Sequence, residues 1–152
     1  MEKFDSKNIE NILALTPLQE GLLFHYLKDP QDGLYFEQLS LELTGPVDRR
    51  YFEKAWNVVI ETNEMLRTVF RWEKLERPSQ LILKVHRCRI LFYDLTDKVE
   101  RLRKVVLAEI KEKDRHENFD LHGVPFRVIL CKLAESKYEM VISNHHIIYD
   151  GW

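Results

Sequence analysis

The sequence has little cysteine and no long hydrophobic run, and both absences exclude classes of protein. Only Cys88 and Cys131 are cysteines among its 152 residues. Their separation matches neither a disulfide framework nor a metal-ligand spacing. No apolar stretch near the N-terminus has the length of a signal peptide or a membrane span. The expected protein is therefore soluble and cytoplasmic.

An excess of charge of one sign is also lacking. Lys and Arg total 23 against 25 Asp and Glu, which gives a net charge of −2. No surplus positive charge is left to bind nucleic-acid phosphates or a membrane surface. The hydrophobic content of 45% and the aromatic content of 11% suffice for one folded domain, or for one lobe of a larger domain.

Three segments have helical patterns. Residues 16–27 begin with a capping box and a proline at the first helical position. Residues 48–62 and 97–115 have apolar side chains at the three-four spacing of a buried helix face. These side chains are Phe52, Ala55, Trp56, Val59 and Ile60 in the second segment, and Val99, Leu102, Val106 and Ile110 in the third.

Strand patterns fill the remaining intervals. Leucines alternate with polar residues over 39–44, which predicts a half-buried strand, and 66–72 and 80–85 are shorter candidates. Residues 126–133 are apolar on both parities, as expected of a strand covered on both faces, and a tight connection joins them to 138–146 in a predicted hairpin. The sequence thus predicts an α+β fold, with helices packed on a mixed β-sheet.

The last predicted strand ends in two adjacent histidines. Along a regular strand Asn144 and His146 share one face, while Ser143 and His145 share the other. The two imidazoles then point in opposite directions and cannot easily converge on one metal ion. The pattern is compatible with two core histidines, or with one histidine facing a reaction cavity and its neighbour packing behind it. The end of an apolar strand, where sites commonly lie, favours His146 as the reactive residue.

Three motifs, in this order, resemble those of a known family. Residues 15–25 read Leu-Thr-Pro-Leu-Gln-Glu-Gly-Leu-Leu-Phe-His, residues 63–70 read Asn-Glu-Met-Leu-Arg-Thr-Val-Phe, and residues 145–152 read His-His-Ile-Ile-Tyr-Asp-Gly-Trp. They are similar to the first two motifs and the HHxxxDG signature of the condensation domains of nonribosomal peptide synthetases, within the chloramphenicol acetyltransferase-like superfamily. One departure is Thr62-Asn63, where the second motif usually has Arg-His.

The resemblance implies a fold and a domain organisation. Residues 15–152 would form the N-terminal lobe of a two-lobed, V-shaped domain, truncated directly after the motif. The C-terminal lobe, which completes the active-site tunnel, and an adenylation domain would follow in the parent chain. Residues 1–14 would be a leader, either a frayed tail or a docking region for an upstream synthetase subunit. The fragment alone is expected to be inactive, with exposed apolar surface where the other lobe belongs.

The resemblance also implies a reaction. The family joins a donor acyl or peptidyl thioester to the amine of an acceptor aminoacyl thioester. Both travel on the phosphopantetheine arms of peptidyl carrier proteins, and no cofactor or metal is bound directly. About a tenth of a free α-amine is neutral at pH 7, so the demanding step is removal of a proton after attack. The implied catalytic residue is His146, as general base or positioning group.

The other motif residues have implied supporting roles. His145 would support the loop, and Gly151 would permit a close backbone approach or a positive φ. Asp150 would pair with Arg67 of the Leu-Arg-Thr motif, and loss of one partner of a buried pair costs about 3–5 kcal/mol. The alternative for Asp150 is an exposed carboxylate before a turn glycine.

Other functions stay open. A coenzyme A-dependent acyltransferase and an epimerization domain share the histidine motif, and a non-catalytic docking lobe would need no catalysis. The Pro-Leu-Gln-Glu-Gly run favours the synthetase branch. Met1 is about fifteen residues before the first motif, so the domain is expected at the start of a subunit, which disfavours epimerization. Heterocyclization domains have aspartates where this chain has histidines. The first motif and the Asp-Gly-Trp ending resemble domains with a D-configured donor and an L-configured acceptor.

Overall fold

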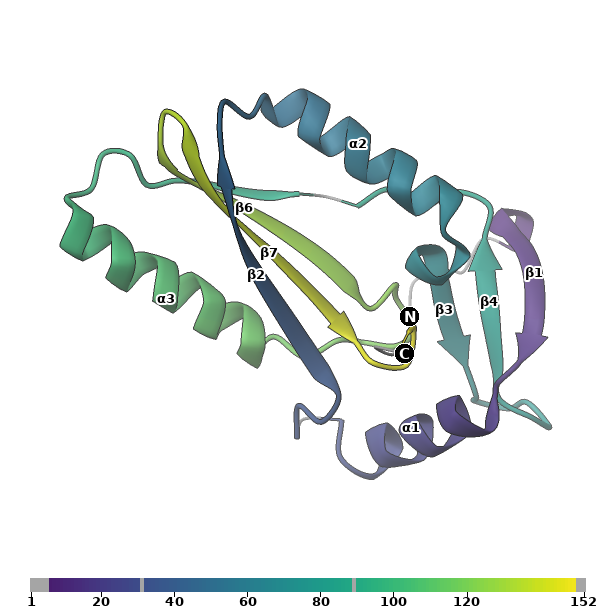
Figure 1. Cartoon of the computed structure of the whole chain (residues 1–152). Helices are drawn as coiled ribbons and strands as arrows, with labels where there is room; N and C mark the ends of the chain where they lie inside the picture. Colours follow the sequence, from purple (N-terminus) through teal and green to yellow (C-terminus); the bar gives the residue numbers. More distant parts are fainter. Residues whose placement is uncertain (1–5, 31, 89, 150–152) are drawn as a thin grey trace.

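The computed structural model describes residues 6–30, 32–88 and 90–149 (Figure 1). Its α-helices are α1 (Pro17–Lys28), α2 (Arg49–Thr62) and α3 (Glu100–His116), with 3₁₀ turns at Ser6–Asn8 and Glu64–Arg67. Its strands are β1 (Ile9–Ala14), β2 (Phe36–Thr44), β3 (Thr68–Arg71), β4 (Ser79–Leu83), β5 (Leu91–Asp94), β6 (Phe126–Ala134) and β7 (Lys137–His145). The predicted α+β fold is confirmed.

The strands form two sheets. The smaller sheet has the order β1-β4-β3 and is antiparallel. The larger sheet has the order β2-β7-β6-β5 and is mixed, because β5 and β6 run parallel while the other neighbours are antiparallel. Strand β7 therefore lies between β2 and β6, and hydrogen bonds on both sides fix the strand that ends in the histidines.

The two faces of the larger sheet are covered by different helices (Figure 1). On the face covered by α3, here called the α3 face, apolar residues of the helix pack on a buried cluster of β5, β6 and β7. On the opposite face, here called the α2 face, Trp56 of α2 lies over β6, with its ring centroid 5.5 Å from that of Phe126. The sheet is thus the middle layer between α3 and α2.

The N-termini of α1 and α2 follow the predicted local signals, whereas α3 begins at Glu100, three positions later than predicted, without a side-chain cap. Thr16 and Gln19 form the capping box, since Gln19 N donates to Thr16 Oγ1 at 3.2 Å and Thr16 N donates to Gln19 Oε1 at 3.0 Å. At α2, Asp48 Oδ1 accepts hydrogen bonds from the backbone N–H groups of Arg50 and Tyr51. Both helix starts are confirmed, because their caps involve only residues within three positions.

Several burial predictions are wrong. Val99 and Leu102 of the predicted α3 stripe are exposed, and so are Val59 and Ala55 of the α2 stripe. In α2 the residues that pack inward are Phe52, Trp56 and Ile60, every fourth position. The helix therefore contacts the sheet along a narrower line than the apolar pattern implies. Leu39 and Leu41 of β2 are also exposed, because they lie on the edge strand that α2 does not cover.

Some segments differ from the sequence predictions. Strands β1 and β5 were not predicted, and Leu66 and Arg67 belong to a 3₁₀ turn that precedes β3. Residues 9–14, assigned to the leader from the sequence, pair with β4 as part of the smaller sheet. Residues 9–14 are therefore part of the folded structure. This strand lacks regular alternation of apolar and polar residues, so only its pairing with β4 reveals it.

Both cysteines are buried and unpaired. Burial raises the pKa of the Cys88 thiol and raises that of Cys131 to about 12. Neither thiol is therefore activated as a nucleophile, although Cys88 follows an arginine in the sequence. No helix within the described ranges has the length and apolar character needed to cross a membrane.

Candidate active site

The histidine pair lies where the central strand of the larger sheet ends. His145 is the last residue of β7, one position earlier than predicted, and it pairs with Phe36 of β2. Its backbone N–H donates to Pro125 O at 3.1 Å, and that of His146 donates to Tyr35 O at 2.8 Å. Backbone hydrogen bonds to segments far away in the sequence therefore fix both histidines before the chain turns.

The turn after the strand is held from three sides. Ile147 and Ile148 are buried in the core, and Ile148 N donates to His145 O at 3.2 Å. From α1, the side-chain Nε2 of Gln19 donates to Ile147 O at 3.1 Å. Gln19 belongs to the first sequence motif, so the first motif directly positions the loop of the last. The sequence alone did not predict this contact.

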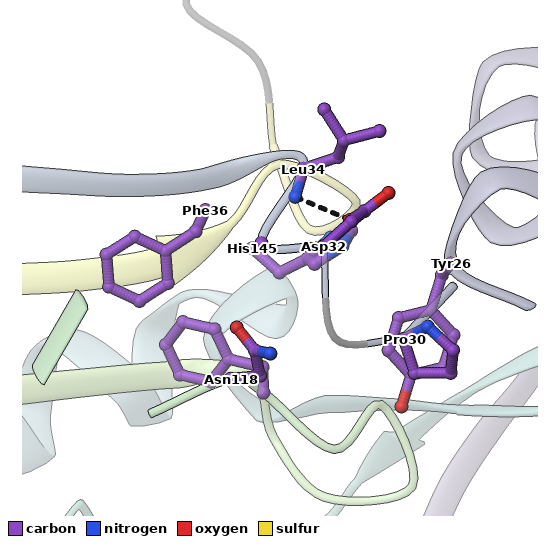
Figure 2. A pocket seen from close by; sticks show the side chains of 9 residues that line it. Tyr26, Pro30, Asp32, Leu34, Phe36, Asn118 and His145 are labelled. Carbon is purple, nitrogen blue, oxygen red and sulfur yellow. Dashed lines mark hydrogen bonds between the residues drawn. The ribbon is translucent and has the colours of Figure 1, made fainter. Parts of the chain in front are cut away.

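His145 is a buried, neutral side chain. Figure 2 shows it beside Phe36 and Asp32, in a small cavity that Tyr26 and Asn118 also line. Its Nδ1 accepts a hydrogen bond from Ile147 N at 3.1 Å, so the proton of the neutral ring is on Nε2. Burial, followed by the charge of His146, lowers the pKa of His145 to about 4. A ring with these properties stabilises the turn in its neutral form.

His146 is the more accessible of the two histidines. Its side chain is 27% exposed, and its Nδ1 lies 3.3 Å from Oε1 of Glu37 on β2. Nδ1 is itself buried and makes no aligned hydrogen bond with any described residue. The exposed area therefore belongs to other atoms of the side chain, and Nδ1 faces the carboxylate. The two imidazoles thus occupy different environments, as the parity of the strand predicts.

Glu37 is part of a hydrogen-bonded chain that the sequence did not reveal. It is directly opposite Asn144 in the β2–β7 pair, and its Oε2 accepts from Asn144 Nδ2 at 3.2 Å. The Tyr149 hydroxyl donates to Asn144 Oδ1 at 2.8 Å. Burial, together with the negative charge of Glu37, raises the pKa of Tyr149. The sequence offered one indication of this role. Glu37 has the same strand parity as Leu39, Leu41 and Leu43, so it places a carboxylate on the face that otherwise carries leucines.

Arg67 of the second motif is buried, with 7% of its surface exposed. Its Nη1 donates to the carboxylate of Glu10 on β1 and to Leu83 O on β4, the latter at 2.5 Å. These contacts join the second motif to the smaller sheet, and Glu10 is a partner that the sequence did not predict. Its Nε is buried without a hydrogen-bond partner among the described residues. Asp150, the predicted partner, lies outside the described residues, as does Gly151.

A groove of about 670 Å³ opens on the α2 face beside the histidine loop. Its lining is mostly apolar and comes from α2, the following turn, β6, β7 and the loop: Trp56, Val59, Asn63, Met65, Leu66, Phe126, Ile142, Ile148 and Tyr149. Ile142 pairs across the strands with the exposed Leu39, so uncovered apolar surface continues from the groove onto β2. Within the described ranges, no group of three His, Cys, Asp or Glu side chains is placed to hold a metal ion.

Comparison with protein families gives a match over nearly the whole chain. Residues 9–152 match the model of the family described as Condensation domain. The chain is 36% identical over 153 aligned positions to surfactin synthase subunit 3 of Bacillus subtilis, with 100% of this chain and 12% of the relative covered. It is 35% identical over 153 positions to tyrocidine synthase 2 of Brevibacillus parabrevis, with 100% and 4% covered. The chain therefore spans only a small part of these relatives.

Solved structures share the fold. The starter condensation domain of rhizomide synthetase superposes with a TM-score of 0.83 at 22% identity, over 93% of this chain and 35% of that one. The first condensation domain of the CDA synthetase gives a TM-score of 0.83 at 19% identity, over 95% of this chain and 37% of that one. At these identities the likeness establishes the architecture, in which this chain matches about a third of each solved chain.

Proposed function

Because this chain belongs to the condensation domain family, we propose that it is the first lobe of an amide-bond-forming domain of nonribosomal peptide synthesis. One observation carries the proposal. The imidazole of His146 is accessible at the end of a central strand, while its neighbour His145 is buried and neutral. An accessible imidazole on a fixed loop is what a proton transfer between two bound substrates requires.

In the proposed reaction the acceptor amine attacks the carbonyl carbon of the donor thioester. The nitrogen of the tetrahedral intermediate then carries a positive charge, and His146 accepts one of its protons through Nε2. Collapse of the intermediate expels the donor thiolate, which takes up a proton, and the amide remains on the acceptor. General-base assistance of this kind contributes roughly 10²–10⁴-fold in rate. A positioning role for His146, holding the amine in line, would use the same geometry.

Donor and acceptor carrier proteins are the proposed partners. Each substrate would arrive as a thioester on a phosphopantetheine arm, which makes the arm part of the substrate and not a cofactor held by this chain. Docking of an upstream subunit at the N-terminus would use Phe4, Ile9, Ile12 and Leu13. Phe4 is outside the described residues, Ile9 pairs with Leu83 of β4, and Ile12 and Leu13 are exposed on β1. The relatives named above are surfactin and tyrocidine synthases, which favours carrier-bound substrates over coenzyme A.

Two supporting roles belong to the same proposal. Asp150 would accept a hydrogen bond from Arg67, and the proposal is supported by the buried Arg67 Nε that lacks a partner among the described residues. Gly151 would permit the backbone conformation of that turn. Replacing Asp150 with Ala should then destabilise the domain by about 3–5 kcal/mol if the pair is buried.

We also propose that a second lobe completes the site. The proposal is supported by the open groove beside the histidine loop and by the exposed Leu39 and Leu41, since soluble monomers rarely leave large apolar patches uncovered. The 152-residue chain alone would then be inactive. Condensation by the purified chain without further polypeptide would contradict this.

The test of the function is the replacement His146→Ala in a full-length domain that contains this sequence. Transfer of a radiolabelled donor from one loaded carrier protein to another should fall about 10²–10⁴-fold, with the circular dichroism spectrum unchanged. His116→Ala is the matched control, because His116 is 74% exposed at the end of α3. Full activity of the His146 variant would disprove the catalytic assignment.

A further inference from the structure

We propose that Glu37 is a positioning residue, which holds the His146 imidazole with Nδ1 toward its carboxylate and Nε2 toward the substrates. The inference rests on the proposed catalytic role of His146 and extends it to a residue outside the three sequence motifs. Three observations carry it: the approach of Glu37 to Nδ1, the fixed register of β2 on β7, and the hydrogen bonds that hold the carboxylate from its other side.

The geometry places Glu37 on one specific nitrogen. Oε1 of Glu37 lies 3.3 Å from Nδ1 of His146, and Nδ1 is buried while the side chain as a whole is 27% exposed. The separation allows a hydrogen bond after a small rotation of the ring, and such contacts are often long in unliganded enzymes. The carboxylate therefore faces the nitrogen that does not point to solvent.

A carboxylate can only accept hydrogen bonds when ionised. Next to Nδ1 it therefore favours the tautomer in which Nδ1 carries the proton and Nε2 has the free lone pair. This is the form that accepts a proton from the substrate amine at Nε2. The resulting imidazolium has its second N–H directed at a negative charge, which stabilises it. No proton passes to Glu37 in this step.

The position of the carboxylate is itself determined by the sheet. Glu37 is directly opposite Asn144, whose side-chain Nδ2 donates to Oε2 at 3.2 Å. Asn144 is 4% exposed, and the Tyr149 hydroxyl fixes its amide orientation by donating to Oδ1 at 2.8 Å. Oε2 is thus committed to Asn144, and Oε1 is left for His146.

This arrangement makes Glu37→Gln a sharp test. The glutamine has one acceptor and one donor group, and Asn144 Nδ2 needs the acceptor. The amide NH₂ would then face Nδ1 of His146 and favour the opposite tautomer, with the proton on Nε2. Glu37→Gln should therefore make the Nε2–H tautomer of His146 the major one, and not merely lower the population of the Nδ1–H tautomer. In the double variant with Tyr149→Phe, Asn144 is free to turn its amide, so the original tautomer should partly return.

The first measurement is ¹⁵N NMR of the His146 ring in the full chain, at a pH of about 8, where ordinary imidazoles are neutral. We expect the Nδ1–H tautomer in the parent and the Nε2–H tautomer in Glu37→Gln. Glu42→Gln is the matched control, since Glu42 lies on the same strand, is 54% exposed and pairs with Lys137. It should leave the ring signals unchanged. The proposal would be overturned if the His146 ring of the parent protein carried its proton on Nε2, or if Glu37→Gln left the tautomer unchanged.

The second measurement is amide-bond formation by a full-length domain. Glu37→Gln should lower kcat by about 10–100-fold, a part of the roughly 10²–10⁴-fold contribution of general-base catalysis. KM for both loaded carrier proteins should stay unchanged, and Tyr149→Phe should restore part of kcat in the double variant. An equal loss in Glu42→Gln, or a loss confined to KM, would contradict the role of Glu37.

The two measurements separate failure of this inference from failure of the proposed function. The NMR experiment requires no catalysis, so a tautomer set by Glu37 would be observed even if His146→Ala kept full activity. That combination would disprove the catalytic assignment and leave the contact intact. An inactive His146→Ala together with an unchanged tautomer in Glu37→Gln would disprove only the role of Glu37.

Discussion

The two faces of the larger sheet differ in how completely they are covered. On the α3 face, buried Asp114 accepts from Arg127 at 2.9 Å, from Gln38 at 2.8 Å and from Ser143. This network ties the helix to β6, β2 and β7. On the α2 face the helix covers only part of the sheet, and Leu39 of β2 stays 54% exposed.

The side chains on the two faces of β7 have different roles: those on one face stabilise the fold, and those on the other lie next to His146. By strand parity Ser143 and His145 of β7 lie on the α3 face. Ser143 Oγ donates to Asp114, and His145 Nδ1 accepts from the backbone N–H of Ile147 in the turn that follows. Asn144, between them, points to the other face and meets Glu37, which reaches His146. Alternation along a single strand therefore separates the groups that hold the loop from those that face the open side.

The largest effect should come from breaking the α3-face network. Asp114→Ala removes the acceptor shared by three side chains and leaves Arg127 unpaired at that site, so the free energy of unfolding should fall by about 3–5 kcal/mol. Urea denaturation measures this. Glu112→Ala is the control, because Glu112 is 56% exposed on the same helix and pairs with Arg115. Equal stability of the two variants would mean that the α3 face is not the stabilising one.

Acidification should act on the same face through His145. Its pKa of about 4 lies below the ordinary value of about 6.5, so the folded state favours the neutral ring. This stability is fully present above a pH of about 6.5 and is lost as the pH falls toward about 4, by about 3 kcal/mol in total. Denaturation at several pH values measures it.

His145→Asn should remove that dependence between pH values of about 6.5 and 5, where ordinary carboxyl groups are still ionised. His122→Asn, at a side chain that is 37% exposed, should keep it. A parent protein whose stability is constant over this interval would show that His145 is not held neutral by burial.

The smallest effect on stability should follow from changes on the open side. Leu39→Ala removes a side chain that is already exposed and should change the free energy of unfolding by about 0.5 kcal/mol or less. The same change at Leu133, which is 6% exposed on the α3 face, should cost about 2–5 kcal/mol. Urea denaturation of the two variants measures the difference. Equal losses of stability in Leu39→Ala and Leu133→Ala would contradict the conclusion that the α3 face is the more completely covered one.

Local features of the fold were predictable because their causes are local. The capping box of Thr16 and Gln19, the Asp48 cap and the turn that joins Ala134 of β6 to Lys137 of β7 depend on residues within three positions of one another. The histidine pair at a strand end, with unlike environments for His145 and His146, follows from the same alternation. The α+β class and the family resemblance came from these patterns.

The coverage of each element was not predictable from the pattern. Apolar spacing in α2 and α3 marks side chains that can be buried, but the helix axis decides which are, and Val59, Val99 and Leu102 stay exposed. Strand β1 is short and lacks alternation, so its pairing with β4 defines it. The supporting contact of Gln19 with the Ile147 carbonyl joins residues 128 positions apart.

The sequence by itself determined the α+β class, the central strand and the residues 145–146 at its end, because periodicity and capping act over a few residues. Only the tertiary structure showed that the His145 imidazole is buried and that the carboxylate of Glu37 lies beside the His146 imidazole. Asn144 and Glu37, hydrogen-bonded across the β2–β7 pair, are 107 positions apart. Such a contact depends on the register between distant strands, which is fixed only when the strands bury their apolar faces together.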